Sequence, residues 1–104
     1  NQWYIALDVP EDIQELLNKL DTAAEAYCKP NQYVSSLKGN TIEIKIPFRY
    51  RKFECEFFNN TGNRIVSEDI KVGDILELNI ECQTLWNMNN ICGLLWKTNI
   101  IKQM

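Results

Sequence analysis

The chain has 104 residues, a net charge of −3 and no histidine, and 45% of its residues are hydrophobic. This is the size of one domain with a single core. Without histidine, the Ser-His-Asp, Cys-His and His-metal sites are all excluded, and no glycine-rich phosphate loop is present. No run of about 18 apolar residues occurs either. We therefore expect no enzyme, cofactor, metal site or membrane partner.

The charge is unevenly distributed along the chain. Residues 1–27 contain six acidic residues and one lysine, whereas residues 38–52 contain five basic residues and one glutamate. The isoelectric point of about 4.9 argues against general adhesion to nucleic acid. A local basic stripe can still bind phosphate groups.

The first third of the chain predicts one strand and one helix. Gln2–Leu7 alternates, with Trp3, Ile5 and Leu7 on one face. Asp8 as a cap and Pro10 in the first turn predict the start of the helix. One buried apolar stripe is expected along it, at Ile13, Leu16, Leu17, Leu20, Ala24 and Tyr27. Because the chain begins at Asn1 inside a strand, without an initiator Met, we expect upstream sequence to be missing.

The middle of the chain predicts short strands. Thr41–Ile46 places its three isoleucines inward, and Pro47 then marks an edge or a bend. Aromatic and charged residues interleave in Phe48–Phe58, and its inward row is Phe53, Cys55 and Phe57. Asn59–Asn63 predicts a hairpin turn before a short strand at Arg64–Val66.

The last segment, Asp74–Met104, predicts a long hairpin with its turn at Asn87–Asn90. Its first strand alternates from Leu76 to Cys82. In the second strand, Gly93 would allow another segment to approach the backbone closely. The expected inward row of this strand is Cys92, Leu94, Trp96, Thr98 and Ile100, and the outward row is Gly93, Leu95, Lys97, Asn99 and Ile101.

Together these elements predict a single domain over residues 1–104. It is mainly β with one α-helix, and its five to six short antiparallel strands form a small barrel or an open sheet. None of the four cysteines has the CxxC spacing of a metal site. Three of them, Cys55, Cys82 and Cys92, lie on apolar strand faces. We expect buried free thiols and an intracellular, reducing compartment.

The strongest functional signal is a mixture of basic and aromatic residues. A single nucleic-acid strand is bound by a basic groove along its phosphates and by aromatic rings that stack on its bases. Lys45–Phe53 contains both residue types, and the C-terminal hairpin adds a second set. In an extended strand, Arg49 and Arg51 would share one face. The candidate nucleic-acid-binding residues are Lys45, Arg49, Tyr50, Arg51, Lys52, Trp86, Trp96 and Lys97.

Simpler roles for these residues stay open. Trp96 lies on the same face as Leu94 and Ile100, which favours core packing. Arg49, Arg51 and Lys52 also fit a solvated strand edge that is protected against aggregation.

Three stretches carry a family resemblance: KIPFRYRKFECEFF (Lys45–Phe58), EDIKVGDILELNIEC (Glu68–Cys82) and LWNMNNICGLLWKTNIIKQM (Leu85–Met104). They resemble OB-fold single-stranded-DNA-binding replication proteins of large DNA viruses and, more distantly, of short-tailed lytic phages. The marked positions of that family's closing hairpin are occupied by Trp86, Gly93, Trp96 and Lys97. The chain departs from the family in lacking the usual additional N-terminal strand and in ending in KQM rather than in an acidic tail.

The resemblance implies an OB-fold β-barrel that binds single-stranded DNA with little sequence preference. Such a protein protects DNA during viral replication or recombination, at the replication site in the host cell, alongside other replication proteins. The sequence leaves open DNA against RNA and the oligomeric state. The alternative is a protein-interaction or assembly module that uses the acidic helix Pro10–Cys28 or an exposed sheet edge.

Overall fold

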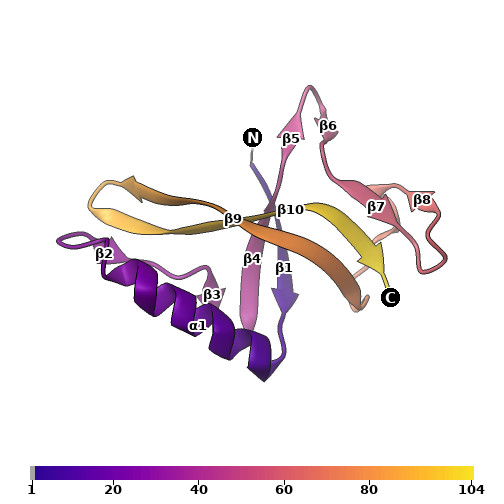
Figure 1. Cartoon of the computed structure of the whole chain (residues 1–104). Helices are drawn as coiled ribbons and strands as arrows, with labels where there is room; N and C mark the ends of the chain where they lie inside the picture. The colour runs from indigo at the N-terminus through magenta and orange to yellow at the C-terminus, as the bar shows by residue number, and fades with distance from the viewer. Residues whose placement is uncertain (1) are drawn as a thin grey trace.

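A long C-terminal hairpin spans the molecule from one end to the other (Figure 1). The structure is a computed structural model that describes residues 2–104. The hairpin consists of β9 (Leu76–Met88) and β10 (Ile91–Gln103), each 13 residues long. Asn89 and Asn90 turn with φ angles of 53° and 68°, the left-handed backbone that asparagine tolerates in tight hairpins. Asn87 and Met88, which we expected in the turn, extend β9 instead.

Strand β10 is hydrogen-bonded along both of its edges. One edge pairs with β9 in antiparallel fashion. The other edge pairs in parallel with three short segments in succession. These segments are β2 (Gln32–Tyr33), β4 (Thr41–Ile46) and β7 (Glu56–Phe58).

The remaining strands add to this frame. β1 (Trp3–Asp8) and β3 (Leu37–Lys38) pair with β4, and β8 (Arg64–Ile65) pairs with β7. A separate small hairpin joins β5 (Phe48–Arg49) to β6 (Lys52–Phe53). The main sheet follows the order β1-β4-β10-β7-β8 and curls into a half-barrel. The mainly β class with one helix is confirmed. The described residues, however, form eight strands in a mixed sheet and two in a separate hairpin, rather than five to six antiparallel strands.

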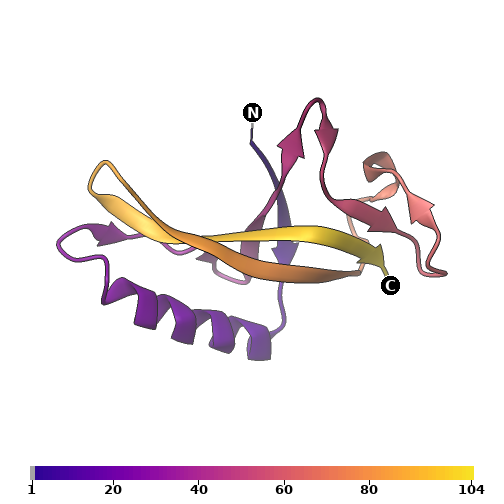
Figure 2. The same ribbon diagram turned by 45° about the horizontal axis from the view of Figure 1, so that its top comes forward.

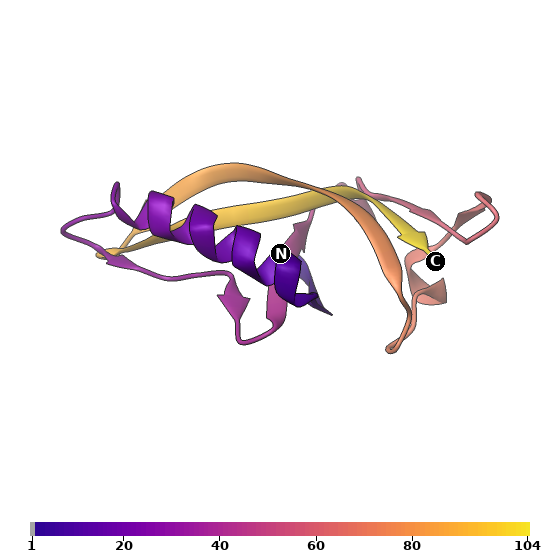
Figure 3. The ribbon, with the colours of Figure 1, turned by 60° about the horizontal axis from the view of Figure 1, so that its bottom comes forward.

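Helix α1 (Glu11–Glu25) lies on one side of the β9–β10 hairpin, and the β5–β6 hairpin projects on the other side (Figures 2 and 3). Only Leu17 is buried, at 4% exposure, whereas Leu16 and Leu20 are 53% and 39% exposed. The predicted single buried stripe is therefore wrong. The helix covers one end of a curved sheet and contacts it along one line, so its second apolar line stays in solvent.

The start of the helix also differs from the prediction. Pro10 occupies the cap position and no side chain caps the first turn. Asp8 belongs to β1, where its carboxylate accepts a hydrogen bond from the Thr41 hydroxyl at 2.9 Å.

The core consists of two apolar clusters that share Ile5 and Leu78 at their boundary. One cluster joins Leu17 of the helix to Ile42 and Ile44 of β4. The other contains Ile46, Cys55, Phe57 and Ile101. The inward rows predicted for β4 and for Phe53, Cys55 and Phe57 are confirmed.

Two irregularities interrupt the β9–β10 ladder, and the second changes which residues of β10 face the core. The register shifts between Leu95 and Trp96 and again between Thr98 and Ile100. Asn99 is the extra residue at the second shift, and it inverts the alternation. Ile101, expected outward, is therefore fully buried. At the bulge, the buried Thr98 hydroxyl donates a hydrogen bond to the backbone carbonyl of Asn79 at 2.6 Å, so this carbonyl has a partner.

Gly93 lies on the same face as Lys97, the outward row that we predicted, but it is buried there. Its neighbours explain why no side chain fits. A Cβ added there would lie 2.4 Å from the Val34 carbonyl oxygen and 3.1 Å from Cζ2 of Trp86. Trp86 is its direct partner across the hairpin. The expected close approach at Gly93 is confirmed, and the approaching groups are the Val34 backbone and the Trp86 indole.

We expect Gly93→Ala to lower the free energy of unfolding by about 1–3 kcal/mol, the usual cost of overpacking a filled site. Urea denaturation followed by circular dichroism measures this loss. Gly62→Ala is a useful comparison, because a Cβ there meets no atom within 4 Å and only its φ of +86° opposes it. Wild-type stability in Gly93→Ala would contradict the observed close contact.

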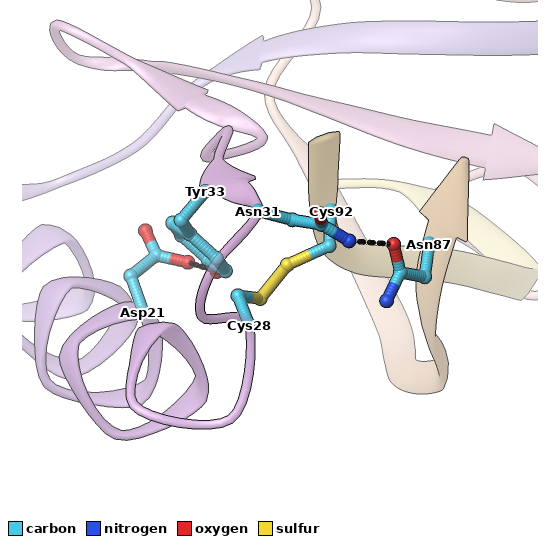
Figure 4. Close-up of a disulfide and its surroundings, with 6 residues drawn as sticks. All are labelled: Asp21, Cys28, Asn31, Tyr33, Asn87 and Cys92. Atoms are coloured by element: carbon cyan, nitrogen blue, oxygen red, sulfur yellow. Dashed lines mark hydrogen bonds between the residues drawn. A yellow bond between two sulfur atoms is a disulfide. The ribbon is translucent and has the colours of Figure 1, made fainter. Parts of the chain in front are cut away.

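A disulfide joins the segment after α1 to the start of β10 (Figure 4). It links Cys28 to Cys92 with 6.1 Å between their Cα atoms. The expectation of free thiols is wrong for this pair, because the chain reversal that brings them together is not visible in their spacing. Beside the disulfide, Asn31 donates a hydrogen bond to Asn87, and Asp21 accepts one from Tyr33. Burial raises the pKa of Tyr33, and the adjacent Asp21 raises it further.

The two remaining cysteines differ in access. Cys55 is buried, as predicted, and burial and the neighbouring Glu56 raise the pKa of its thiol to about 11. Cys82 is exposed, contrary to the prediction. Within residues 2–104, β9 pairs with β10 alone, so the apolar alternation of β9 is not covered there.

We expect a thiol reagent at neutral pH to label one cysteine, Cys82, in the folded protein. Unfolding without a reductant should expose Cys55 and raise the count to two, and reduction should raise it to four. Mass spectrometry after labelling gives each count. Cys82→Ser is the control and should remove the native signal; labelling of Cys55 in the folded state would contradict its burial.

Candidate nucleic-acid interface

A row of four side chains crosses the sheet on the face opposite the core. The strand registers pair Tyr4 with Lys45, Lys45 with Lys97, and Lys97 with Glu81. Residues directly opposite one another on neighbouring strands project from the same face. Since Ile44 and Lys45 alternate along β4, this face is the one turned away from the buried isoleucines.

Lys45 and Lys97 form a like-charge pair at the centre of this row. Such pairs are destabilising in a sheet unless something offsets them. Lys97 Nζ lies 3.0 Å from Oε1 of Glu81, which neutralises one of the two charges. None of the ion pairs among residues 2–104 involves Lys45. The protein therefore holds an uncompensated positive charge at a fixed position on the sheet.

The β5–β6 hairpin adds a second cationic group. It turns at Tyr50 and Arg51, which have φ angles of 55° and 64°, and Tyr50 is 85% exposed. The extended strand in which Arg49 and Arg51 would share one face does not form here. Pro47 ends β4 and the tight turn reverses the chain, so Arg49 lies opposite Lys52 rather than on one face with Arg51.

An aromatic cluster holds this hairpin in place. Trp3 packs on Phe48 and Phe53, with ring centroids 5.7 Å and 5.5 Å apart. Phe48 and Phe53 are direct partners in the hairpin, 5.0 Å apart, and Phe53 also reaches Phe57 in the core. Such edge-on contacts favour one orientation of the rings. The charged turn is thus presented on a packed base.

The sheet row and the hairpin meet at a pocket of about 400 Å³. It brings together three predicted site residues, Lys45, Arg49 and Lys97. Arg49 Nε lies 3.2 Å from Oε1 of Glu54, which also lines the pocket. Two of the three cations are paired with carboxylates and Lys45 is not, so the site has a net positive charge that can accept an anionic group such as a phosphate. Gln2 and Gln83 add neutral polar side chains to the wall.

The other predicted site residues lie in three different places. Tyr50, Arg51 and Lys52 are exposed at the hairpin turn and do not line the pocket. Trp86 lines a second hollow that also borders Tyr4. Trp96 projects to the other face and packs against the cluster of Leu17, Ile42 and Ile44, the core placement favoured by its alternation.

Sequence reasoning missed several residues of these two hollows: Gln2, Tyr4, Lys38, Gln83 and Leu95. The signal for Tyr4 was available, since Trp3 and Ile5 were predicted on one face of the strand and Tyr4 alternates with them. The position of Gln83 depends on the first register shift in the β9–β10 pairing, and no sequence pattern predicts that shift.

Other site types find no support within residues 2–104. No group of three or more His, Cys, Asp or Glu side chains there could hold a metal ion. The helices of this part of the chain are too short or too polar to cross a bilayer.

No protein-family model matches this chain, and no curated protein or solved structure is significantly similar to it.

Proposed function

We propose that this protein binds single-stranded DNA with little sequence preference. The observation that supports this most strongly is the pocket in which Lys45, Lys97 and Arg49 converge. Two of these residues are direct cross-strand partners of like charge, an arrangement that an anionic ligand would relieve.

The surroundings of the pocket favour a polymer over an isolated anion. Exposed Tyr50 and Arg51 lie at one end of this surface, on the β5–β6 turn, and Trp86 lies in the hollow beyond Lys45. Alternating cations and aromatic rings suit the phosphates and bases of an unpaired strand. The left-handed backbone at Tyr50 and Arg51 is costly for residues other than glycine, and such strain is typical of functional turns.

The curled, mainly β sheet with its closing hairpin is consistent with an OB-type barrel, and we extend the proposal to that class. Together with the motifs of Lys45–Phe58 and Leu85–Met104, this supports a role in protecting exposed strands during viral DNA replication or recombination. Parallel titrations with oligo-dT and oligo-U decide between DNA and RNA, because only RNA carries the 2′-hydroxyl group.

Fluorescence anisotropy with labelled oligo-dT at several salt concentrations tests the proposal. Affinity should fall as salt rises, because bound lysines and arginines release counterions from the phosphates. Lys45→Ala should weaken binding to all base sequences alike and reduce the salt slope by about 1.

Lys19→Ala is the matched control, since it removes the same charge from α1, on the other side of the β9–β10 hairpin. It should leave the slope unchanged. Failure of the wild-type protein to bind oligo-dT at low salt would refute the proposed function.

The carboxylates at the pocket compete with the ligand for its cations. We therefore expect Glu81→Gln and Glu54→Gln each to raise the affinity for oligo-dT, by about two- to fivefold, the range typical of exposed ion pairs. Glu56→Gln makes the same change of net charge at an ion pair with Arg64 outside the pocket, and it should have a smaller effect. Equal gains in all three variants would show that only the total charge matters.

A second candidate function is a protein-interaction module. It is favoured by the exposed apolar line of α1, formed by Ile13, Leu16 and Leu20, and by the outer edge of β9, which pairs with no strand among the described residues. Charge reversal at Glu15 and Glu25 should then abolish capture of the partner, whereas Lys45→Ala should not affect it.

A further inference from the structure

A second hollow of about 220 Å³ lies on the same face of the sheet as the basic pocket. Its aromatic walls are Tyr4 of β1 and Trp86 of β9, and Leu94 and Leu95 of β10 also line it. Tyr4 is 44% exposed. A shift of β1 by one residue would turn its ring to the core face, because side chains alternate between the two faces of a strand. The hollow thus has an aromatic lining that the fold does not use for its own core.

Residues that line the hollow are direct neighbours of residues that line the basic pocket. Tyr4 is the cross-strand partner of Lys45, and its hydroxyl donates a hydrogen bond to Oε1 of Gln2 at 2.6 Å. Lys45 and Gln2 both line the basic pocket. On β10, Leu95 of the hollow precedes Lys97 of the pocket by two residues, a distance of about 7 Å along a strand. Tyr4 therefore places the hollow next to the basic pocket.

The opposite wall is held in a defined place. Trp86 packs over Gly93, and its Cζ2 would lie 3.1 Å from a Cβ added there, which is tighter than an ordinary contact. The glycine carries no side chain that could push the ring away. At the rim, Lys38 Nζ lies 3.8 Å from Oε1 of Glu43, and both residues border the hollow. An amine and a carboxylate at the edge of an aromatic site can donate to and accept from a polar ring.

We propose that this hollow binds one unstacked nucleobase of the strand whose phosphates occupy the basic pocket. The inference rests on the proposed function and deepens it, because it names the structural state of the ligand. A base that enters between Tyr4 and Trp86 has left its stack and its pairing partner, so the site selects single strands over duplexes. Tyr4 and Trp86 supply stacking surface, and the Lys38–Glu43 pair contacts the edge of the base.

The test compares two ligands of equal length and charge, a labelled oligo-dT and an oligomer of abasic deoxyribose phosphates. The wild-type protein should bind oligo-dT at least about fivefold more tightly, the lower end of what one stacked base contributes. Tyr4→Leu should remove most of this preference and leave the affinity for the abasic oligomer unchanged. Tyr27→Leu is the control, since Tyr27 is exposed in the segment after α1 and lines neither hollow.

Tryptophan fluorescence provides a second measurement that does not depend on Tyr4. Oligo-dT should quench the emission of the wild-type protein and of Trp3→Phe, and this quenching should be largely lost in Trp86→Phe. Equal wild-type affinity for both oligomers, an unchanged preference in Tyr4→Leu, or unchanged quenching in Trp86→Phe overturns the base site. Binding of neither oligomer refutes the proposed function as well, so the two failures are distinguishable.

Discussion

The structure depends on the backbone hydrogen bonds along the two edges of β10. β9 occupies one edge for nearly its whole length, and β2, β4 and β7 share the other. Segments that are far apart in the chain are thereby brought to one strand. Because each register alternates side chains between two faces, this pairing also determines which residues meet on the outer face. Both the core and the candidate site follow from it.

The outer face combines features that are costly for folding. It opposes Lys45 to Lys97 and leaves Tyr4 partly in solvent, and it requires a glycine beneath Trp86. In natural proteins the local preferences of the sequence usually agree with the overall fold, and local conflicts of this kind occur mainly at functional sites. The carboxylates of Glu54 and Glu81 lower the electrostatic cost in the free protein. In the proposed function, a bound phosphate would balance the positive charge in place of these carboxylates. Ligand binding would then open the ion pairs that Glu54 and Glu81 form.

On the inner face of the sheet, the constraint is that the apolar core is shallow. The chain extends over 46 × 34 × 18 Å, with a radius of gyration of 14.9 Å, above the value of about 13 Å typical of a compact domain of this length. A thin half-barrel can contact the helix along one line of side chains. Leu17 is therefore buried and Leu16 is not. The Cys28–Cys92 disulfide attaches the end of the helical segment to β10.

Alternation and helical spacing in the sequence determined the elements themselves. The helix, the inward isoleucines of β4, the row of Phe53, Cys55 and Phe57, and the hairpin of β9 and β10 all followed from local pattern. Only the tertiary structure decided where these elements meet. Parallel pairing on β10, the bulge at Asn99 and the disulfide all join or displace segments through long-range contacts that no local spacing records. For the same reason, the sequence identified Lys45 and Lys97 as separate candidates, and the fold made them neighbours.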